Sequence, residues 1–130
     1  MYLFAYGTLR RVLAPPELRE LMETWRDLGR GTVPGRLYDL GAYPGAVLDS
    51  AGSTSIVGEV YQLPNGHLDR LDQYEGFDGN DESASLFVRR SCLVALDDGQ
   101  QLACSIYVYN GETSSAEVIA NGDYLYAKSR

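Results

Sequence analysis

The chain has 130 residues, of which 45% are hydrophobic and 22% charged, values typical of a globular protein with a substantial core. Its formal net charge is −7 and its pI is near 4.5, which argues against nucleic acid as a partner because phosphate binding requires clustered basic side chains. The apolar start has no basic leader, and no apolar run reaches the length of about eighteen residues that a membrane span needs. We therefore expect a single cytoplasmic domain over residues 1–130, with no membrane or nucleic-acid partner.

The first ten residues predict a short buried strand that ends in a tight turn. Tyr2 to Tyr6 are all aromatic or apolar, a run too short for a helix, and Gly7 follows them. A glycine at this place permits a positive φ or a close approach of the backbone to a ligand. The successive N–H groups of Gly7, Thr8 and Leu9 can bind an anionic or carbonyl oxygen. An ordinary turn at the end of a first strand has the same spacing, so both interpretations stay open here.

A helix is predicted to begin at Pro15-Pro16, because proline is tolerated in a first helical turn. We expect it to end at Gly29 and Gly31. Its apolar side chains recur at i, i+3, i+4 and i+7, the pattern of an amphipathic helix with one buried stripe. The stripe consists of Leu18, Leu21, Met22 and Trp25.

Strands are expected next over residues 32–40, 46–48 and 56–63. The loop between the first two, Gly41 to Gly45, is rich in turn formers and contains Tyr43. Such a loop can bring backbone and an aromatic ring near a ligand, and it is equally typical of a plain surface turn. Tyr43 is therefore a candidate substrate contact.

A second helix is predicted over residues 67–75, with Gly76 ending it. Leu68 and Leu71 define its apolar face, and Glu75 lies seven and four residues after them, on that same face. Burial of a carboxylate raises its pKa, and the negative end of the helix dipole acts in the same direction. Glu75 is thus a candidate acid or base for proton transfer near neutral pH. The alternative is that the helix frays at Gly76 and Glu75 turns toward water.

No metal site or organic cofactor is expected. His67, the only histidine, could form a metal cluster with Asp69 and Asp72, but both aspartates fall off the leucine face. We interpret this surface of the helix as solvent-exposed. The chain contains no nucleophile elbow, P-loop or dinucleotide-binding fingerprint.

The two cysteines give no spacing typical of a metal site or a disulfide framework. They fall on two strands, over residues 86–96 and 101–109, which an Asp-Gly turn connects. A two-residue turn at Asp98-Gly99 would place Cys92 and Cys104 on opposite faces of the sheet, whereas a three-residue loop would place them directly opposite each other. The Asp-Gly dipeptide favours the two-residue turn, so we expect free thiols that act as small core residues.

The order of the elements indicates the fold class. Residues 77–85, acidic and rich in small side chains, are expected to form a mobile loop, and residues 116–121 a helical turn. Strands dominate, helices are few and short, and no βαβ alternation occurs. This order predicts an α+β fold with a mostly antiparallel, barrel-like sheet.

Five motifs occur in one order over most of the chain: Tyr6-Gly7-Thr8-Leu9, Gly35-x-Leu37-Tyr38, Gly58-Glu59-Val60-Tyr61, Leu71-Asp72-x-Tyr74-Glu75-Gly76 and Gly122-Asp123-Tyr124. Together they resemble the γ-glutamylcyclotransferase-like family. The chain is more similar to the AIG2-like, γ-glutamylamine cyclotransferase branch than to the glutathione-metabolism branches, because no asparagine follows Thr8. The family often has Tyr-x-Arg where this chain has Phe87-Val88-Arg89.

The resemblance implies a compact α+β fold with a barrel and a cofactor-independent transferase. The family's reaction is an intramolecular aminolysis, in which the α-amine of a γ-glutamyl group attacks its own γ-carbonyl and releases 5-oxoproline and an amine. By this resemblance Glu75 is the general acid/base, and Tyr6, Gly7, Thr8 and Leu9 bind a small γ-glutamyl substrate. A non-catalytic small-molecule-binding domain with a retained pocket is the alternative. A third possibility is the same ring closure on a protein-linked or antibiotic-linked γ-glutamyl chain, and the oligomeric state stays open.

Overall fold

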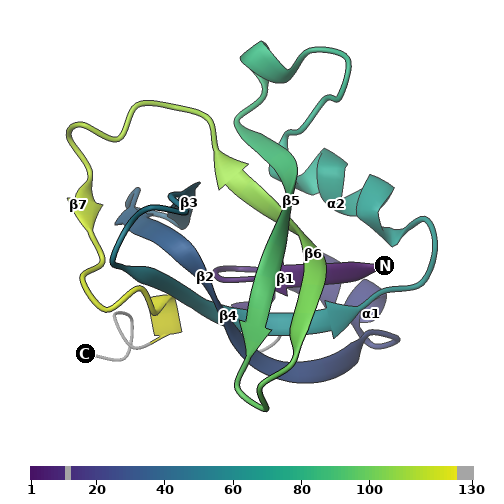
Figure 1. Ribbon diagram of the computed structural model, residues 1–130. Coiled ribbons are helices and arrows are strands. Elements are labelled where there is room, and N and C mark those ends of the chain that lie inside the picture. The colour runs from purple at the N-terminus through teal and green to yellow at the C-terminus, as the bar shows by residue number, and fades with distance from the viewer. Residues whose placement is uncertain (11–12, 126–130) are drawn as a thin grey trace.

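A computed structural model describes residues 1–10 and 13–125 of the chain. In this part of the chain five strands form a closed barrel in the order β2-β4-β1-β6-β5, because β5 also pairs with β2 (Figure 1). All neighbouring pairs are antiparallel except β1 and β6, which run parallel. The barrel strands are β1 (Tyr2–Ala5), β2 (Arg26–Asp39), β4 (Ser55–Gln62), β5 (Phe87–Leu96) and β6 (Gln101–Tyr109).

Two further strands extend the sheet beyond the barrel along the second half of β2. These are β3 (Pro44–Leu48) and β7 (Glu117–Val118), both antiparallel to β2. The prediction of a helical turn over 116–121 was wrong, since Val118 pairs with Tyr38 as a short strand. The fold is α+β with a mostly antiparallel barrel, as predicted.

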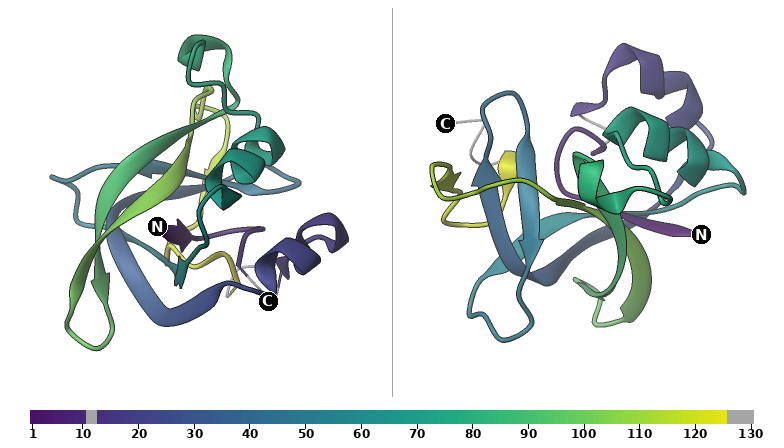
Figure 2. Two further views of the ribbon diagram at one scale, coloured as in Figure 1. Left: turned by 90° about the vertical axis from the view of Figure 1, so that its right-hand side faces the viewer. Right: turned by 90° about the horizontal axis from the view of Figure 1, so that it is seen from above.

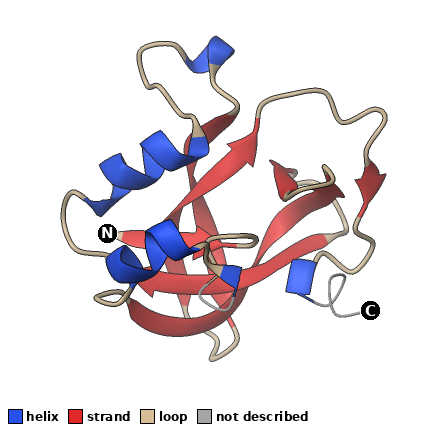
Figure 3. Cartoon of the chain, turned by 180° about the vertical axis from the view of Figure 1, so that it is seen from behind, coloured by secondary structure: helices blue, strands red, loops and turns tan. Residues whose placement is uncertain are grey.

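The two α-helices lie on the same side of the barrel (Figures 2 and 3). Helix α1 (Pro16–Met22) and helix α2 (His67–Glu75) contribute to one buried cluster through Leu18, Met22 and Leu71. Helix α2 has the bounds that its leucine spacing predicted. No helix in the described ranges is long and apolar enough to span a membrane.

Strand β2 begins six residues earlier than predicted, so the glycines expected to end the first helix lie within the strand. Gly31 is required where β2 meets β5, because a Cβ atom there would lie 2.6 Å from Val94 Cγ1 and 3.1 Å from the Ala95 carbonyl oxygen. Gly29 follows a register shift in the pairing with β4 and has a φ of 108°. Helix α1 is correspondingly shorter than predicted. Trp25 lies beyond it and is still buried.

The Leu96 N–H donates to the Gln100 carbonyl at 2.8 Å, so the loop that joins β5 to β6 consists of the three residues 97–99. The predicted two-residue turn was therefore wrong. The N–H of Gly99 donates to the Leu96 carbonyl (3.0 Å), and Gly99 has a φ of 93°, the arrangement of a type I turn followed by a bulge. This register pairs Cys92 directly with Cys104. Both thiols are free, as predicted, with Cys104 buried and Cys92 half-buried.

The segment after α2 contains a short 3₁₀ helix, η2 (Glu82–Ala84). The Asn110 side-chain amide donates to the carbonyl oxygens of Glu82 and Ser85, both at 2.9 Å, and so connects the segment to the end of β6. The Asp78 N–H donates to Ser85 Oγ at 2.9 Å. These hydrogen bonds hold the segment to itself and to the residue after β6. Its mobility stays a prediction.

Candidate active site

A cavity of about 310 Å³ opens where the turn after β1, the loop before β3 and the C-terminal end of α2 meet. Its volume is at the lower end of the range for small-molecule sites. The six residues proposed from the sequence all line it: Tyr6, Gly7, Thr8, Leu9, Tyr43 and Glu75.

The turn after β1 packs against the loop that precedes β3. A Cβ atom on Gly7 would lie only 2.6 Å from Pro44 Cγ, so a glycine is needed for this close approach. Gly7 does not have a positive φ, so that part of the expectation from sequence was wrong. A close approach of its backbone to a ligand stays a prediction. The Arg10 N–H donates to the Gly7 carbonyl at 2.9 Å and closes the turn. Among the described residues no acceptor is found for the N–H groups of Gly7, Thr8 and Leu9.

A buried arginine anchors the end of this turn. The Arg10 side chain is 4% exposed and forms ion pairs with Glu59 (3.1 Å) and Asp123 (2.9 Å). Tyr61 donates a hydrogen bond of 2.6 Å to the other Glu59 oxygen. Glu59 is partly buried in this network. The sequence around Arg10 gave no indication of this network, because the acidic partners of Arg10 come from β4 and from the C-terminal segment.

Glu75 is the last residue of α2, lines the cavity and is half-buried. Gly76 ends the helix with a φ of 71°, and the N–H of Phe77 donates to the Asp72 carbonyl at 2.9 Å. The helix end is therefore capped and does not fray. Burial raises the pKa of Glu75 to about 7. Among the described residues no hydrogen bond or ion pair involves its carboxyl group.

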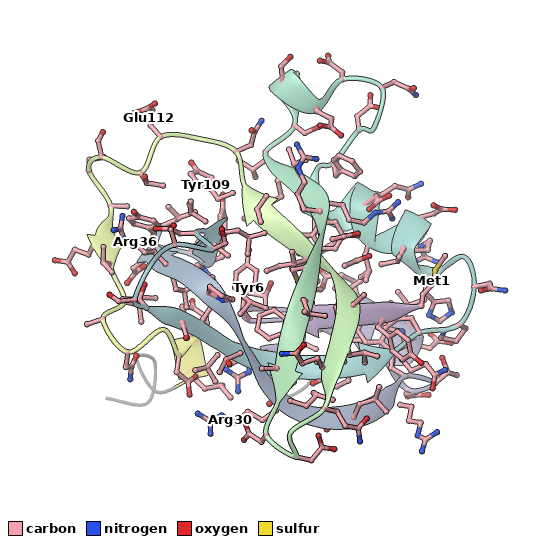
Figure 4. The ribbon with its side chains drawn as sticks, viewed as in Figure 1. Met1, Tyr6, Arg30, Arg36, Tyr109 and Glu112 are labelled. Carbon is pink, nitrogen blue, oxygen red and sulfur yellow. The ribbon has the colours of Figure 1, made fainter. Side chains whose placement is uncertain are left out.

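The Tyr6 hydroxyl forms two hydrogen bonds to backbone groups of the protein, and Tyr6 also lines the cavity. Tyr6 lies inside the ring of strands (Figure 4), donates to the Tyr107 carbonyl and accepts from the Ala46 N–H at 3.3 Å. Burial, and then the charge of Glu75, raise the pKa of Tyr6. The hydroxyl thus stays protonated and holds β1 against β6 beside the site.

Asp72 belongs to a charged cluster behind the cavity, so the expectation that it is solvent-exposed was wrong. Tyr107, which lines the cavity, donates a 2.6 Å hydrogen bond to Asp72, and Arg89 pairs with the same carboxylate at 3.0 Å. Burial is the largest cause of the raised pKa of Tyr107. Sequence spacing along α2 missed this cluster because Arg89 and Tyr107 reach it from the barrel strands.

The surface around His67 holds no metal-type cluster. In the described ranges no three His, Cys, Asp or Glu side chains lie close enough together to bind a metal ion. The Trp25 indole N–H donates to His67 Nδ1 at 2.9 Å, and Asp69 is exposed.

Comparison with known proteins identifies the family. A model of the family described as gamma-glutamyl cyclotransferase, AIG2-like, matches residues 3–126. The chain belongs to this family. The cavity that contains Glu75 and the turn after β1 is thus the candidate active site of a γ-glutamyl cyclotransferase family member.

Three relatives illustrate the similarity. The gamma-L-glutamyl-butirosin B gamma-glutamyl cyclotransferase of Niallia circulans is 32% identical over 109 residues, which cover 83% of this chain and 66% of that protein. The crystal structure of YkqA from Bacillus subtilis is 25% identical, with a TM-score of 0.72 over 99% of this chain and 42% of YkqA. The solution structure of ytfP from Escherichia coli is 29% identical, with a TM-score of 0.68 over 98% of this chain and 99% of ytfP. The chain thus spans just under two thirds of the first protein and less than half of the second.

The mouth of the cavity in this family member is apolar and aromatic. Tyr74 and Leu86 line it and are 38% and 46% exposed. Burial raises the pKa of the Tyr74 hydroxyl, and the neighbouring Thr8 side chain in the turn after β1 acts in the opposite direction. The ring of Phe87, which is buried, lies 5.7 Å from the ring of Tyr43, measured between centroids. Tyr74, Leu86 and Phe87 were not predicted as site residues from the sequence.

Proposed function

We propose that the protein is a γ-glutamyl cyclotransferase that releases 5-oxoproline and a free amine from a γ-glutamyl amine or amide. One observation carries this proposal: the half-buried Glu75 carboxyl group and the turn after β1 line the same small cavity, although 68 positions of sequence separate Gly7 from Glu75. Within residues 1–10 and 13–125, neither this carboxyl group nor the N–H groups of Gly7, Thr8 and Leu9 have a hydrogen-bond partner. The family supports the same activity. The Niallia circulans relative, a γ-glutamyl cyclotransferase named for γ-L-glutamyl-butirosin B, supports a γ-glutamyl compound as the substrate.

The reaction starts at the free α-amine of the γ-glutamyl group. Its nitrogen lone pair attacks the γ-carbonyl carbon, a new C–N bond closes the five-membered ring, and the carbonyl electron pair moves onto oxygen. The Glu75 carboxylate accepts the proton that the attacking nitrogen loses. The original amide C–N bond then breaks, and the Glu75 carboxyl group returns the proton to the leaving nitrogen. The products are 5-oxoproline and the amine, and no water is consumed.

The pKa of Glu75 suits both halves of this proton transfer. A carboxyl group with a pKa of about 7 is present in both protonation states near neutral pH. The carboxylate can therefore act as the base in the first half, and the acid that results is strong enough to protonate the leaving amine. An exposed glutamate with an ordinary pKa would be a much weaker base.

The turn after β1 supplies the groups that hold the substrate. The N–H groups of Gly7, Thr8 and Leu9 can donate to the substrate carboxylate or to the oxyanion that forms during attack. A single donor of this kind contributes about 10²- to 10³-fold to the rate in known enzymes. Because the reaction is intramolecular, Tyr6 and Tyr43 assist by holding the γ-glutamyl chain in its folded, ring-closing conformation.

The test is 5-oxoproline formation from a panel of γ-glutamyl amines and γ-glutamyl amino acids. The Glu75→Gln variant keeps the shape of the side chain and removes its proton transfer, so we expect kcat/KM to fall by at least about 100-fold. Asp69→Asn is the matched control, because it removes an exposed carboxylate from the same helix and should leave activity unchanged.

Two results would contradict the proposal. The first is equal activity of the wild type and Glu75→Gln. The second is a wild type that is inert across the whole panel yet shows a higher melting temperature with 5-oxoproline, which would identify a small-molecule-binding domain instead.

A further inference from the structure

Arg10 connects the turn after β1 to two acidic side chains that lie outside the cavity. Its own N–H closes the turn on the Gly7 carbonyl at 2.9 Å, so a movement of this residue moves the turn. Each terminal nitrogen of its buried side chain binds a different acid: Nη1 donates to Asp123 Oδ1 at 2.9 Å and Nη2 to Glu59 Oε2 at 3.1 Å. One buried cation thus holds the turn from behind.

Strand β4 fixes Glu59 through both of its carboxylate oxygens. Oε2 accepts from Arg10, and Oε1 accepts the 2.6 Å hydrogen bond from the hydroxyl of Tyr61, which is fully buried. In the sheet Glu59 is the register partner of Ala5, two residues before Gly7. The carboxylate is therefore fixed relative to the strand from which the turn begins.

Asp123 belongs to the tail motif Gly122-Asp123-Tyr124, to which the reaction assigns no role. Two contacts fix this motif against the barrel. The Val57 N–H donates to the Gly122 carbonyl at 2.8 Å, and the Tyr124 side chain is buried in the core. The motif thus directs the Asp123 carboxylate toward Arg10.

We propose that Arg10, Glu59 and Asp123 are positioning residues, which orient the N–H groups of the turn for the oxygen that the substrate presents to them. This inference rests on the proposed function and adds three residues to it. None of the three lines the cavity, so their effect reaches it through the backbone of the turn. Donors to a developing oxyanion must be in place before the reaction, and a displacement of about 1 Å can cost about 100-fold in rate.

The chemistry of the network favours positioning over stability. Taking an arginine and two carboxylates out of water is costly, and apolar side chains of similar volume often give equal or greater stability. Charge-assisted hydrogen bonds are short and directional, whereas apolar contacts are not. A buried cation bonded on two sides therefore defines the backbone geometry of the turn more closely than packing alone would.

Substitutions of the two acids test the inference, because they keep or remove the oxygen that Arg10 binds. Asp123→Ala removes it, and we expect kcat/KM for 5-oxoproline formation to fall at least about tenfold. Asp123→Asn has a similar shape and keeps one oxygen for Arg10, so its loss should stay below about threefold. Glu59→Gln replaces one of two accepting oxygens by an amide nitrogen and cannot serve both Tyr61 and Arg10, so a loss of at least about tenfold is expected.

Measurement on folded protein separates positioning from a loss of fold. The variants are compared at a temperature at which circular dichroism shows each of them to be folded. A purely structural role would lower the melting temperature of Asp123→Ala and leave kcat/KM of the folded molecules unchanged. Asp97→Asn is the matched control, because it removes the carboxylate of an exposed ion pair with Arg30 (3.5 Å) and should leave kcat/KM unchanged.

Amide hydrogen exchange measured by NMR reports on the turn without reference to activity. The Arg10 N–H, whose hydrogen bond closes the turn, should exchange faster in Asp123→Ala and Glu59→Gln than in the wild type. The hydrogen-bonded N–H of Leu63, just after β4, is the internal reference and should exchange at the same rate in all of them.

The outcomes distinguish the inference from the function on which it rests. Undiminished kcat/KM in folded Asp123→Ala and Glu59→Gln, equal losses in Asp123→Ala and Asp123→Asn, or unchanged exchange of the Arg10 N–H would overturn the inference and leave the proposed function standing. A wild type that forms no 5-oxoproline from any member of the panel would overturn both.

Discussion

The burial that raises the pKa of Glu75 should cost the protein stability, and the size of that cost follows from the shift in the pKa. Burial raises the pKa of Glu75 from 4.5 to about 7. In the unfolded chain the group ionises near its ordinary pKa, so above that pH the unfolded state binds fewer protons than the folded state. Stability that is fully present below about pH 4.5 is therefore lost as the pH rises through 7. Each pKa unit is worth about 1.4 kcal/mol, so the loss above neutral pH is about 3 kcal/mol.

Glu75→Gln removes this ionisation and keeps the volume of the side chain. We expect the variant to be more stable than the wild type by up to about 3 kcal/mol near pH 8 and equal to it near pH 4. Urea unfolding of both proteins at the two pH values measures the difference, in which the titration of all other groups cancels. Asp69→Asn, on the exposed face of α2, should show no comparable gain at either pH.

A Glu75→Gln variant whose free energy of unfolding equals that of the wild type at both pH values would refute this reasoning. It would mean that the Glu75 carboxyl group is solvated in the folded protein. The combination of a more stable and less active variant is the expected outcome for a residue whose placement serves chemistry rather than stability.

Two further predictions concern the turn after β1. Gly7→Ala places a methyl group 2.6 Å from Pro44 Cγ, so we expect a loss of about 1–3 kcal/mol in the free energy of unfolding and a higher KM. Gly79→Ala is the control, because the nearest neighbour of its methyl group is 3.8 Å away, and it should change neither quantity. Equal behaviour of the two variants in urea unfolding and in kinetics would contradict this prediction. Arg10→Met removes the cation that pairs with the partly buried carboxylates of Glu59 and Asp123, so the free energy of unfolding should fall by about 3–5 kcal/mol. A loss below about 1 kcal/mol in the same urea experiment would show that the network is not structurally important.

Local patterns predicted helix α2 well. Leu68, Leu71 and Glu75 share a face because the α-helix repeats every 3.6 residues, and Gly76 marked the end because it can adopt a positive φ. Placing a carboxylate on the apolar face, and the raised pKa that follows, needed no knowledge of the rest of the chain. The same kind of local reasoning was less reliable at Asp72, since its partners Arg89 and Tyr107 lie on distant strands.

Features that depend on how strands meet were not accessible from local patterns. By local pattern Gly29 and Gly31 predict the end of a helix, but both lie in β2, and Gly31 is needed where the barrel closes against β5. The Asp98-Gly99 dipeptide indicated a turn correctly but not its length, and the extra residue changed the partner of Cys92. In each case contacts across the sheet outweighed the local preference of a few residues.

The amino-acid sequence by itself determined which residues are proposed to carry the chemistry, since the nature of the turn at Gly7–Leu9 and the position of Glu75 on its helix are local properties. It also determined the class of fold through the alternation and spacing of its strands. Only the tertiary structure decided that the turn and the carboxyl group share one cavity, that Pro44 is the close neighbour of Gly7, and that Arg10 is buried between two acids. The physical reason is that these contacts join segments far apart in the chain, and their geometry is set by barrel closure rather than by the preferences of any one segment.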